Sequence, residues 1–193
     1  MSFMLLAICG KSGSGKTTLL YYLEQLGFER IVTYTTRPKR PGEEDDITYH
    51  YIDKDLFNKL NESHFFAETT SYYVNGGDKW LYGTANEDLK SDKDQVLIVN
   101  PDGLATLRQL KVPMIAFYID VPDFELRRRL EKRGDNKDEV KRRLMADEED
   151  FNEKIINRLV DWYVADWWSS PFDMAEKIER VYRNHLERLG KDR

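Results

Sequence analysis

A glycine-rich segment near the start of the sequence has the residue types and spacing that bind nucleotide phosphates. It consists of Gly10, Lys11, Ser12, Gly13, Ser14, Gly15, Lys16 and Thr17, which match the pattern G-x-x-x-x-G-K-[ST] without a gap. Glycines let backbone N–H groups curl round phosphate oxygens, and the following helix offers its positive N-terminus. The lysine of this pattern reaches the β- and γ-phosphates, and the threonine hydroxyl binds Mg²⁺. We therefore predict an ATP site that ends at Thr18, with Lys16 in a catalytic role and Thr17 as the metal ligand.

Two arginines farther along the chain, Arg37 and Arg40, suit a second phosphate group. Guanidinium groups hold a dianionic phosphate monoester through bidentate hydrogen bonds. The hydroxyl groups of Tyr49 and Tyr82 can complete the hydrogen bonds of that phosphate. We predict that these four residues bind the phosphate of an acceptor substrate. The alternative is a solvated turn whose arginines pair with the acidic residues 43–46.

Glu68 is the candidate for recognising the base of the acceptor. Guanine presents N1–H and N2–H side by side, and one carboxylate can accept hydrogen bonds from both, with Thr33 and Thr84 as neutral partners. On adenine the same carboxylate would face an acceptor nitrogen. A carboxylate placed beside the base of the acceptor would therefore favour guanine over adenine.

A third polar segment is strongly basic. Residues 127–143 hold nine basic and four acidic side chains, a local charge of +5 in an acidic protein. Arginines of this kind neutralise the charge that spreads over a phosphoryl group during transfer. We predict catalytic roles for Arg129, Arg133 and Arg143, and a solvated surface for the other basic residues near the start of the segment.

Apolar runs of strand length alternate with helical patterns, which indicates a parallel sheet with helices on both faces. Strands are expected at 4–9, 29–34, 95–99, 114–119 and 162–165, and helices at 16–25, 101–110, 123–132, 137–152 and 171–189. The phosphate loop then joins a buried strand to a helix, as its pattern requires. Residues 34–94 break this rhythm with turn clusters at 38–46 and 75–79, and we expect a strand-rich insertion with a short helix at 53–61.

Composition excludes several classes of protein. The chain has 193 residues and a net charge of −5, which argues against a broad basic surface for nucleic acid or anionic membrane. The single cysteine, Cys9, allows no internal disulfide and suits a reducing compartment. The longest apolar run, residues 3–9, is far shorter than the ~20 residues that span a bilayer. We expect a cytoplasmic protein that binds small molecules and neither nucleic acid nor membrane.

Four segments, in order along the chain, resemble motifs of the guanylate kinase family. The phosphate loop is followed by TYTTRPKRPGE at 33–43 and by Tyr49, which resemble the loop that binds the monophosphate. The sequences FAE at 66–68 and LYGT at 81–84 resemble two further acceptor motifs, and the arginines at 129, 133, 142 and 143 resemble the lid. The resemblance covers residues 3–145.

The resemblance implies a single α/β domain with the P-loop kinase fold: a three-layer sandwich with a parallel sheet, an inserted monophosphate-binding subdomain and a helical lid. The core is expected at 1–32, 95–126 and 156–193, the insertion at 33–94 and the lid at 127–155. The implied reaction is the ATP-dependent phosphorylation of GMP or dGMP to GDP or dGDP, with Mg²⁺ bound to ATP. Two alternatives stay open: a kinase of the same fold that acts on another nucleotide or a phosphorylated ribose, and a non-catalytic guanylate-kinase-like binding module.

The sequence departs from the family pattern in two parts of the acceptor site. Aligned on Gly103, Ile98 and Asn100 stand where the family has acidic residues, and we expect Asn100 beside the base, where it weakens the choice of guanine. The chain between Glu68 and Tyr82 is several residues longer than in the family. The sequence assigns no role to this extension.

Two segments nearer the end of the chain have less specific predictions. Residues 161–170 are rich in tryptophan, where the family has an adenine loop. We expect these tryptophans to pack in the core or at a sheet edge, with adenine stacking or a homodimer face as alternatives. The acidic residues 147–150 are expected to form a solvated helix face.

Overall fold

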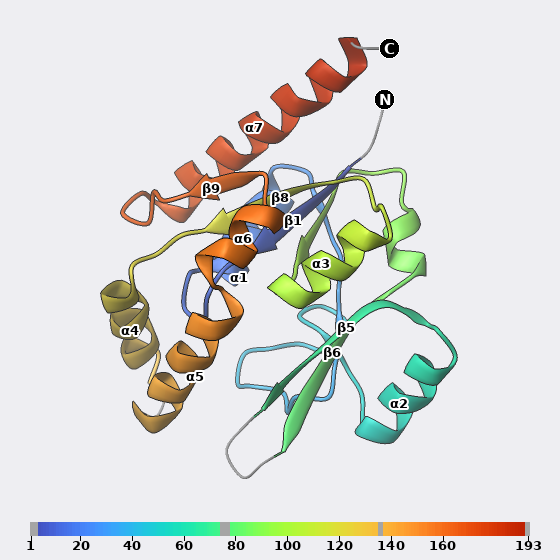
Figure 1. Cartoon of the computed structure of the whole chain (residues 1–193), viewed down its shortest axis with the longest axis vertical. Helices are drawn as coiled ribbons and strands as arrows, with labels where there is room; N and C mark the ends of the chain where they lie inside the picture. The colour runs from blue at the N-terminus through green and yellow to red at the C-terminus, as the bar shows by residue number, and fades with distance from the viewer. Residues whose placement is uncertain (1–3, 74–77, 135–136, 192–193) are drawn as a thin grey trace.

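Parallel strands form the central sheet of the molecule (Figure 1). The computed structural model describes residues 4–73, 78–134 and 137–191. Within these residues the sheet has five strands in the order β2–β7–β1–β8–β9. Their bounds are Leu5–Cys9 (β1), Glu29–Arg30 (β2), Gln95–Ile98 (β7), Met114–Ile119 (β8) and Trp162–Val164 (β9). The parallel sheet predicted from the sequence is confirmed.

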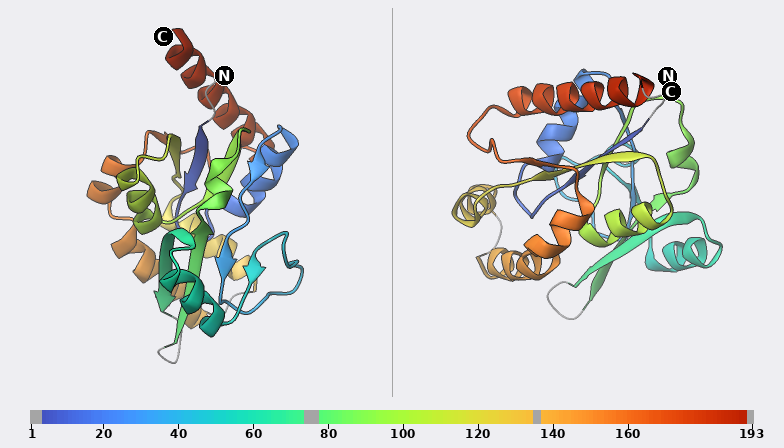
Figure 2. Two further views of the ribbon diagram at one scale, coloured as in Figure 1. Left: turned by 90° about the vertical axis from the view of Figure 1, so that its right-hand side faces the viewer. Right: turned by 45° about the horizontal axis from the view of Figure 1, so that its top comes forward.

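Helices cover both faces of this sheet, as the right-hand view of Figure 2 shows: α1 (Lys16–Gln25) and α7 (Pro171–Lys191) on one face, α3 (Pro101–Gln109) and α6 (Glu153–Leu159) on the other. This explains why β1 is apolar throughout. Leu6 and Ile8 pack beneath α1 and α7, whereas Leu5, Ala7 and Cys9 pack beneath α3 and α6. A strand covered on both faces has no polar side, so its sequence shows no alternation.

Tyr182 of α7 fastens this helix to the sheet. Its side chain is fully buried, and its ring lies 5.0 Å from that of Phe28. The hydroxyl is hydrogen-bonded at 2.7 Å to the carbonyl oxygen of Met4 and at 2.6 Å to Oδ1 of Asp94. The helix is therefore joined to both the start of β1 and the residue that precedes β7.

A second sheet is built from the residues between β2 and β7 and lies at the lower right of Figure 1. Its strands follow the order β4–β3–β6–β5, with bounds Tyr34–Thr35 (β3), His50–Tyr51 (β4), Phe66–Tyr73 (β5) and Lys79–Ala85 (β6). Strands β5 and β6 form a long antiparallel hairpin, and part of the turn cluster predicted at 75–79 lies outside the described residues. Helix α2 (Lys54–Glu62) and the 3₁₀ turn η1 (Glu87–Lys90) complete this part.

The single strand predicted over residues 29–34 is wrong. Strand β2 ends at Arg30, and Tyr34 already pairs with Gly83 of the second sheet. The backbone N–H of Ile31 still donates to Val96, whereas the carbonyl of Thr33 accepts from His50. An apolar run cannot reveal where a chain leaves one sheet for another, because both parts bury apolar side chains.

Helices α4 (Asp123–Lys132) and α5 (Lys137–Asp150) lie across from the β5–β6 hairpin (Figure 1). The helix predicted over 137–152 ends at Asp150, and the separate helix α6 follows it. The side chain of Asn152 accepts a hydrogen bond from the N–H of Lys154 and so caps the start of α6, a signal that the sequence analysis missed. In the part of the chain that the structure covers, no helix is both long and apolar enough to cross a bilayer.

Candidate active site

A cavity of about 660 Å³ lies between the phosphate loop, the second sheet and α5. Its walls bring together most of the predicted site residues: Gly10, Ser12, Gly13, Ser14, Gly15, Lys16, Thr17, Thr18, Thr33, Arg37, Arg40, Tyr49, Glu68, Tyr82, Asn100, Arg129, Arg133 and Arg143. Two predicted residues lie outside these walls. Lys11 forms an ion pair at 2.8 Å with Asp123, and Thr84 is buried behind Glu68.

The phosphate loop joins β1 to α1 and turns on two glycines. Gly13 and Gly15 have φ angles of 81° and 97°, a left-handed conformation that side chains rarely adopt. Among the described residues no side chain caps the start of α1, and its first turn contains no acidic residue. The first N–H groups of this helix are therefore open to an anion.

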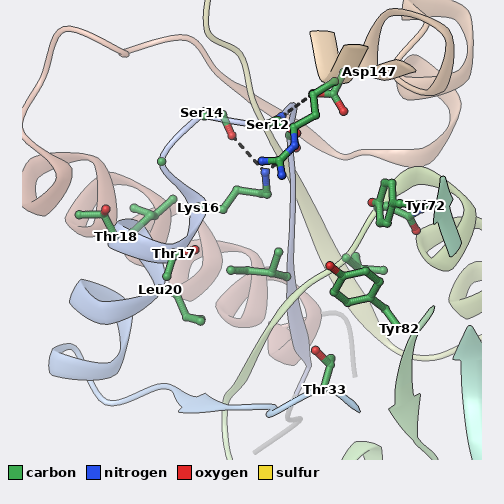
Figure 3. A pocket seen from close by; sticks show the side chains of 18 of the residues that line it. Ser12, Ser14, Lys16, Thr17, Thr18, Leu20, Thr33, Tyr72, Tyr82 and Asp147 are labelled. Atoms are coloured by element: carbon green, nitrogen blue, oxygen red, sulfur yellow. Dashed lines mark hydrogen bonds between the residues drawn. The ribbon is translucent and has the colours of Figure 1, made fainter. Parts of the chain in front are cut away.

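Lys16 lies folded against this loop (Figure 3). Its Nζ donates to the carbonyl oxygens of Gly10 and Lys11 at 2.6 and 2.9 Å. Burial lowers the pKa of Lys16 below its ordinary value. Thr17, the next residue, is exposed on the cavity wall, where its hydroxyl can bind a cation.

The carboxylate of Asp147, on α5, binds a backbone N–H group of the phosphate loop. Oδ2 of Asp147 accepts a hydrogen bond of 2.6 Å from the backbone N–H of Ser12 (Figure 3). The prediction of a solvated face over residues 147–150 is therefore wrong for Asp147, which is 5% exposed, although the three residues after it are exposed. Burial raises the pKa of Asp147. The backbone group that this carboxylate binds is one that the loop pattern offers to phosphate.

Arg37 and Arg40 line the acceptor side of the cavity. Arg37 is 4% exposed and forms an ion pair of 2.7 Å with Glu43, so the alternative pairing with the acidic turn exists alongside the position in the cavity wall. Glu43 also accepts hydrogen bonds from the Arg40 N–H at 2.8 Å and from Tyr51 at 2.7 Å. Burial works against the charge of Glu43, but these three donors lower its pKa to about 2. Glu43 thus holds the arginine loop in shape.

Arg133 and Arg143 lie near this loop. Burial and the positive charges of Arg37, Arg143 and Arg133 lower the pKa of Arg40. The four guanidinium groups therefore lie near enough to act on one another, and the carboxylate of Glu43 offsets part of their repulsion.

Arg129 connects the donor side to α4. Its guanidinium group donates to the carboxylate of Glu125 at 2.7 Å, to the Ser14 carbonyl at 3.2 Å and to the Trp167 carbonyl at 2.9 Å.

Trp167 lines the cavity, whereas Trp168 is 68% exposed, so the prediction of core or edge packing is wrong for Trp168.

Glu68 presents one free oxygen at the far end of the cavity. Its Oε1 accepts a hydrogen bond of 2.5 Å from Thr84, whereas Oε2 is buried and has no hydrogen-bond partner within the described chain. Burial raises the pKa of this carboxyl group. The helix α3 approaches closely here, because a Cβ atom on Gly103 would lie 2.5 Å from Oε2. A buried oxygen without a partner marks a position that a ligand donor can fill.

The side chain of Asn100 is engaged within the protein. Its Oδ1 accepts from the N–H of Gly103 at 2.9 Å and so caps α3, and its Nδ2 donates to Thr70 Oγ1 at 2.6 Å. Asn100 and Thr70 both line the cavity near Glu68. The amide oxygen of Asn100 therefore accepts a hydrogen bond within the protein before any base binds.

The residues of the cavity wall that sequence reasoning missed include Tyr72, Trp80 and Asp147. Tyr72 lies two and four residues from Thr70 and Glu68 on β5, a period-two signal that becomes visible only once the strand is known. The sequence gives no such signal for Asp147, because the three residues after it are also acidic and the structure leaves those three exposed. Within the described residues no group of three or more His, Cys, Asp or Glu side chains could hold a metal ion.

A phosphate loop after a buried parallel strand, facing a cluster of arginines across one cavity, defines a P-loop phosphotransferase. The family model for guanylate kinase matches residues 3–161. A guanylate kinase of Oleidesulfovibrio alaskensis is 38% identical, over 74% of this chain and 71% of that protein. A guanylate kinase of Coxiella burnetii is 31% identical, over 96% of this chain and 94% of that protein. The chain therefore belongs to the guanylate kinase family, which confirms the resemblance and the enzyme class predicted from the sequence.

Solved structures agree with this assignment at the level of fold. The crystal structure of a guanylate kinase from Anaplasma phagocytophilum superimposes with a TM-score of 0.67 at 17% identity, over 96% of this chain and 87% of that one. A shikimate kinase from Acinetobacter baumannii gives a TM-score of 0.54 at 13% identity, over 95% of each chain. The predicted P-loop kinase fold is confirmed.

Proposed function

We propose that this protein transfers the γ-phosphoryl group of ATP to GMP or dGMP. The observation that carries the choice of acceptor is Oε2 of Glu68, a buried carboxylate oxygen without a partner in the described chain, in the same cavity as the phosphate loop. The N1–H and N2–H groups of guanine supply donors to such a carboxylate. Adenine offers it an acceptor nitrogen and would leave it unpaired, at a cost of about 1–3 kcal/mol.

The acceptor phosphate is proposed to bind between Arg37, Arg40, Tyr49 and Tyr82. Burial raises the pKa of both tyrosines, so both hydroxyls keep their protons and donate hydrogen bonds. Thr33 and Thr84 assist near the base, Thr84 by holding Oε1 of Glu68. Asn100 acts on the same site through Thr70.

The donor nucleotide is proposed to bind along the phosphate loop, from Gly10 to Thr18. Lys16 leaves its contacts with loop carbonyls for the β- and γ-phosphates, and the Thr17 hydroxyl holds Mg²⁺. When bound with ATP, Mg²⁺ supplies charge neutralisation across the β- and γ-phosphates. Arg129, Arg133 and Arg143 neutralise the charge on the transferring group from the other side.

We also propose that residues 33–94 form the insertion that binds the monophosphate, that residues 127–155 form a lid over the core, and that the protein acts in the cytoplasm. In this scheme residues 127–155 close over both substrates and exclude water, which limits the loss of ATP by hydrolysis. A second acceptor class is favoured by one observation, the engaged side chain of Asn100 where an acidic residue is typical of the family. The intact phosphate loop weighs against a non-catalytic module.

The test is a panel of acceptors with ATP and Mg²⁺: GMP, dGMP, AMP and a phosphorylated ribose. We expect GMP or dGMP to have the highest kcat/KM. Glu68→Gln should lower kcat/KM for GMP by about 10- to 100-fold, since a hydrogen bond to a charged group contributes about 1.5–3 kcal/mol. Glu62→Gln, at an exposed position at the end of α2, is the matched control and should change nothing. A preference for another acceptor, unchanged by Glu68→Gln, would contradict the proposal.

A further inference from the structure

Tyr72 lies on β5, between Glu68 and Tyr82, where the spacing along the chain is longer than the family pattern. Alternate side chains of a strand share a face, and Glu68, Thr70 and Tyr72 all line the cavity. Four residues of strand span about 13 Å, which is close to the distance from the base to the phosphate of a nucleoside monophosphate. A guanine held at Glu68 therefore places its phosphate near Tyr72.

The neighbours of Tyr72 agree with this position. Its ring lies 5.5 Å from that of Tyr82, which is in the predicted phosphate site. In Figure 3 these two tyrosines project from one wall of the cavity and Lys16 projects from the opposite wall. Tyr72 thus lies beside a residue of the proposed acceptor-phosphate site and faces the lysine of the phosphate loop.

The hydroxyl of Tyr72 is available as a donor. It forms no hydrogen bond with any residue in the described ranges. Burial, together with the negative charges of Asp147 and Asp150, raises the pKa of Tyr72, so the phenol keeps its proton at neutral pH. A neutral O–H group in a buried wall donates to phosphate oxygens without adding a charge that must itself be desolvated.

The hairpin is held in place from both sides. Tyr72 pairs with Trp80 across the hairpin, and both side chains line the cavity. The carbonyl oxygen of the next residue, Tyr73, accepts a hydrogen bond of 2.6 Å from Arg142 of α5. A hydrogen bond thus joins α5 to the strand that carries Tyr72.

We propose that Tyr72 is a further catalytic residue of this kinase, whose hydroxyl donates a hydrogen bond to the phosphate oxygens where the acceptor meets the transferring γ-phosphoryl group. The inference rests on the proposed function. The phenol forms no covalent bond and gives up no proton. It stabilises charge that develops on oxygen during the transfer.

The test compares Tyr72→Phe with Tyr73→Phe. Both changes remove only a hydroxyl, but the side chain of Tyr73 is 61% exposed and belongs to the other face of β5. We expect Tyr72→Phe to lower kcat for GMP about 10- to 100-fold with the KM for ATP within twofold of wild type, and Tyr73→Phe to leave both unchanged. A dinucleoside polyphosphate that joins both substrates should also bind Tyr72→Phe at least fivefold more weakly.

Three outcomes separate the two proposals. If wild type phosphorylates GMP and the two variants behave alike, the role of Tyr72 is wrong and the proposed function stands. If Tyr72→Phe raises the KM for GMP with kcat unchanged, Tyr72 binds the ground state and the transition state equally, and the proposed stabilisation of the transition state is wrong. If wild type does not phosphorylate GMP, the proposed function fails and the inference fails with it.

Discussion

Asp147→Asn is the change that we expect to strengthen the binding of ATP. The carboxylate of Asp147 holds the N–H of Ser12 at 2.6 Å, and this N–H belongs to the loop that must receive the donor phosphates. ATP has to displace the carboxylate before its own oxygens can use that donor. Lys11 and Lys16 are the positive groups near Asp147, and they favour its charged form without removing the competition.

The size of the effect follows from the contact that is lost. A hydrogen bond to a charged group contributes about 1.5–3 kcal/mol, and one to a neutral group about 0.5–1.5 kcal/mol. Asparagine keeps the oxygen but not the charge, so the contact weakens by about 1–1.5 kcal/mol. This difference corresponds to a roughly 5- to 10-fold lower Kd for ATP. The loss of repulsion between the carboxylate and the triphosphate acts in the same direction.

The measurement is calorimetric titration with Mg²⁺ and a non-hydrolysable ATP analogue at fixed salt, with Glu148→Gln on the exposed face of α5 as control. The gap between wild type and Asp147→Asn should narrow below neutral pH. Because the pKa of Asp147 is raised, its carboxyl group begins to take up a proton at a higher pH than an ordinary aspartate. An unchanged or higher Kd in Asp147→Asn would refute the reasoning and would indicate that the carboxylate assists ATP.

Four further predictions concern the acceptor site and the phosphate loop. Gly103→Ala should raise the KM for GMP more than tenfold and leave the KM for ATP within twofold of wild type, because the new Cβ would lie 2.5 Å from Oε2 of Glu68. An unaltered KM for GMP would count against the binding of a base at this carboxylate. Arg37→Ala should raise the KM for GMP and also lower Tm by several degrees, since it leaves Glu43 without its closest cation; a lower Tm with an unaffected KM would leave Arg37 a structural role only. Lys16→Met should lower kcat more than 100-fold with an unchanged circular dichroism spectrum, and retention of a tenth of the activity would exclude the phosphate-loop assignment. Glu68→Gln should raise Tm, and the increase should be larger at pH 8 than at pH 4. Burial raises the pKa of Glu68 in the folded state. The stability that this carboxyl group contributes is therefore present below its unfolded-state pKa and is lost as the pH rises through its folded-state pKa. A gap in Tm that does not vary with pH would show that Glu68 does not titrate in this way.

The phosphate loop and the arginine loop could be predicted because their chemistry is local. Each needs particular residue types at fixed spacing within a few residues, and the apolar strand before Gly10 supplies the context. The same holds for most of the helices and for the parallel sheet. Residues that are brought together from distant segments by such elements, such as Arg40 and Arg143, follow only through the family resemblance.

The parts that could not be predicted depend on tertiary contacts. Asp147 is one of four acidic residues in a row, and nothing in the run distinguishes the one that faces the phosphate loop. The departure of the chain from the central sheet after Arg30 has no local signal, because the apolar run continues to Tyr34. The contact of Asn100 with Thr70 likewise has no local signal, whereas its place as the cap of α3 follows from the helix predicted to begin at residue 101.

The anchor at Tyr182 has a consequence for the order in which the chain is made. Both hydrogen-bond partners of its hydroxyl precede it in the sequence: Asp94 is 88 positions earlier, and Met4 is 178 positions earlier. A ribosome adds ~5–20 residues per second, so roughly 4–18 s separate the synthesis of Asp94 from that of Tyr182. During that interval the face of the sheet beneath α7, including Phe28, has no cover from the helix that will bury it. Newly made chains are therefore open to chaperones and to aggregation on this face until α7 has been synthesised.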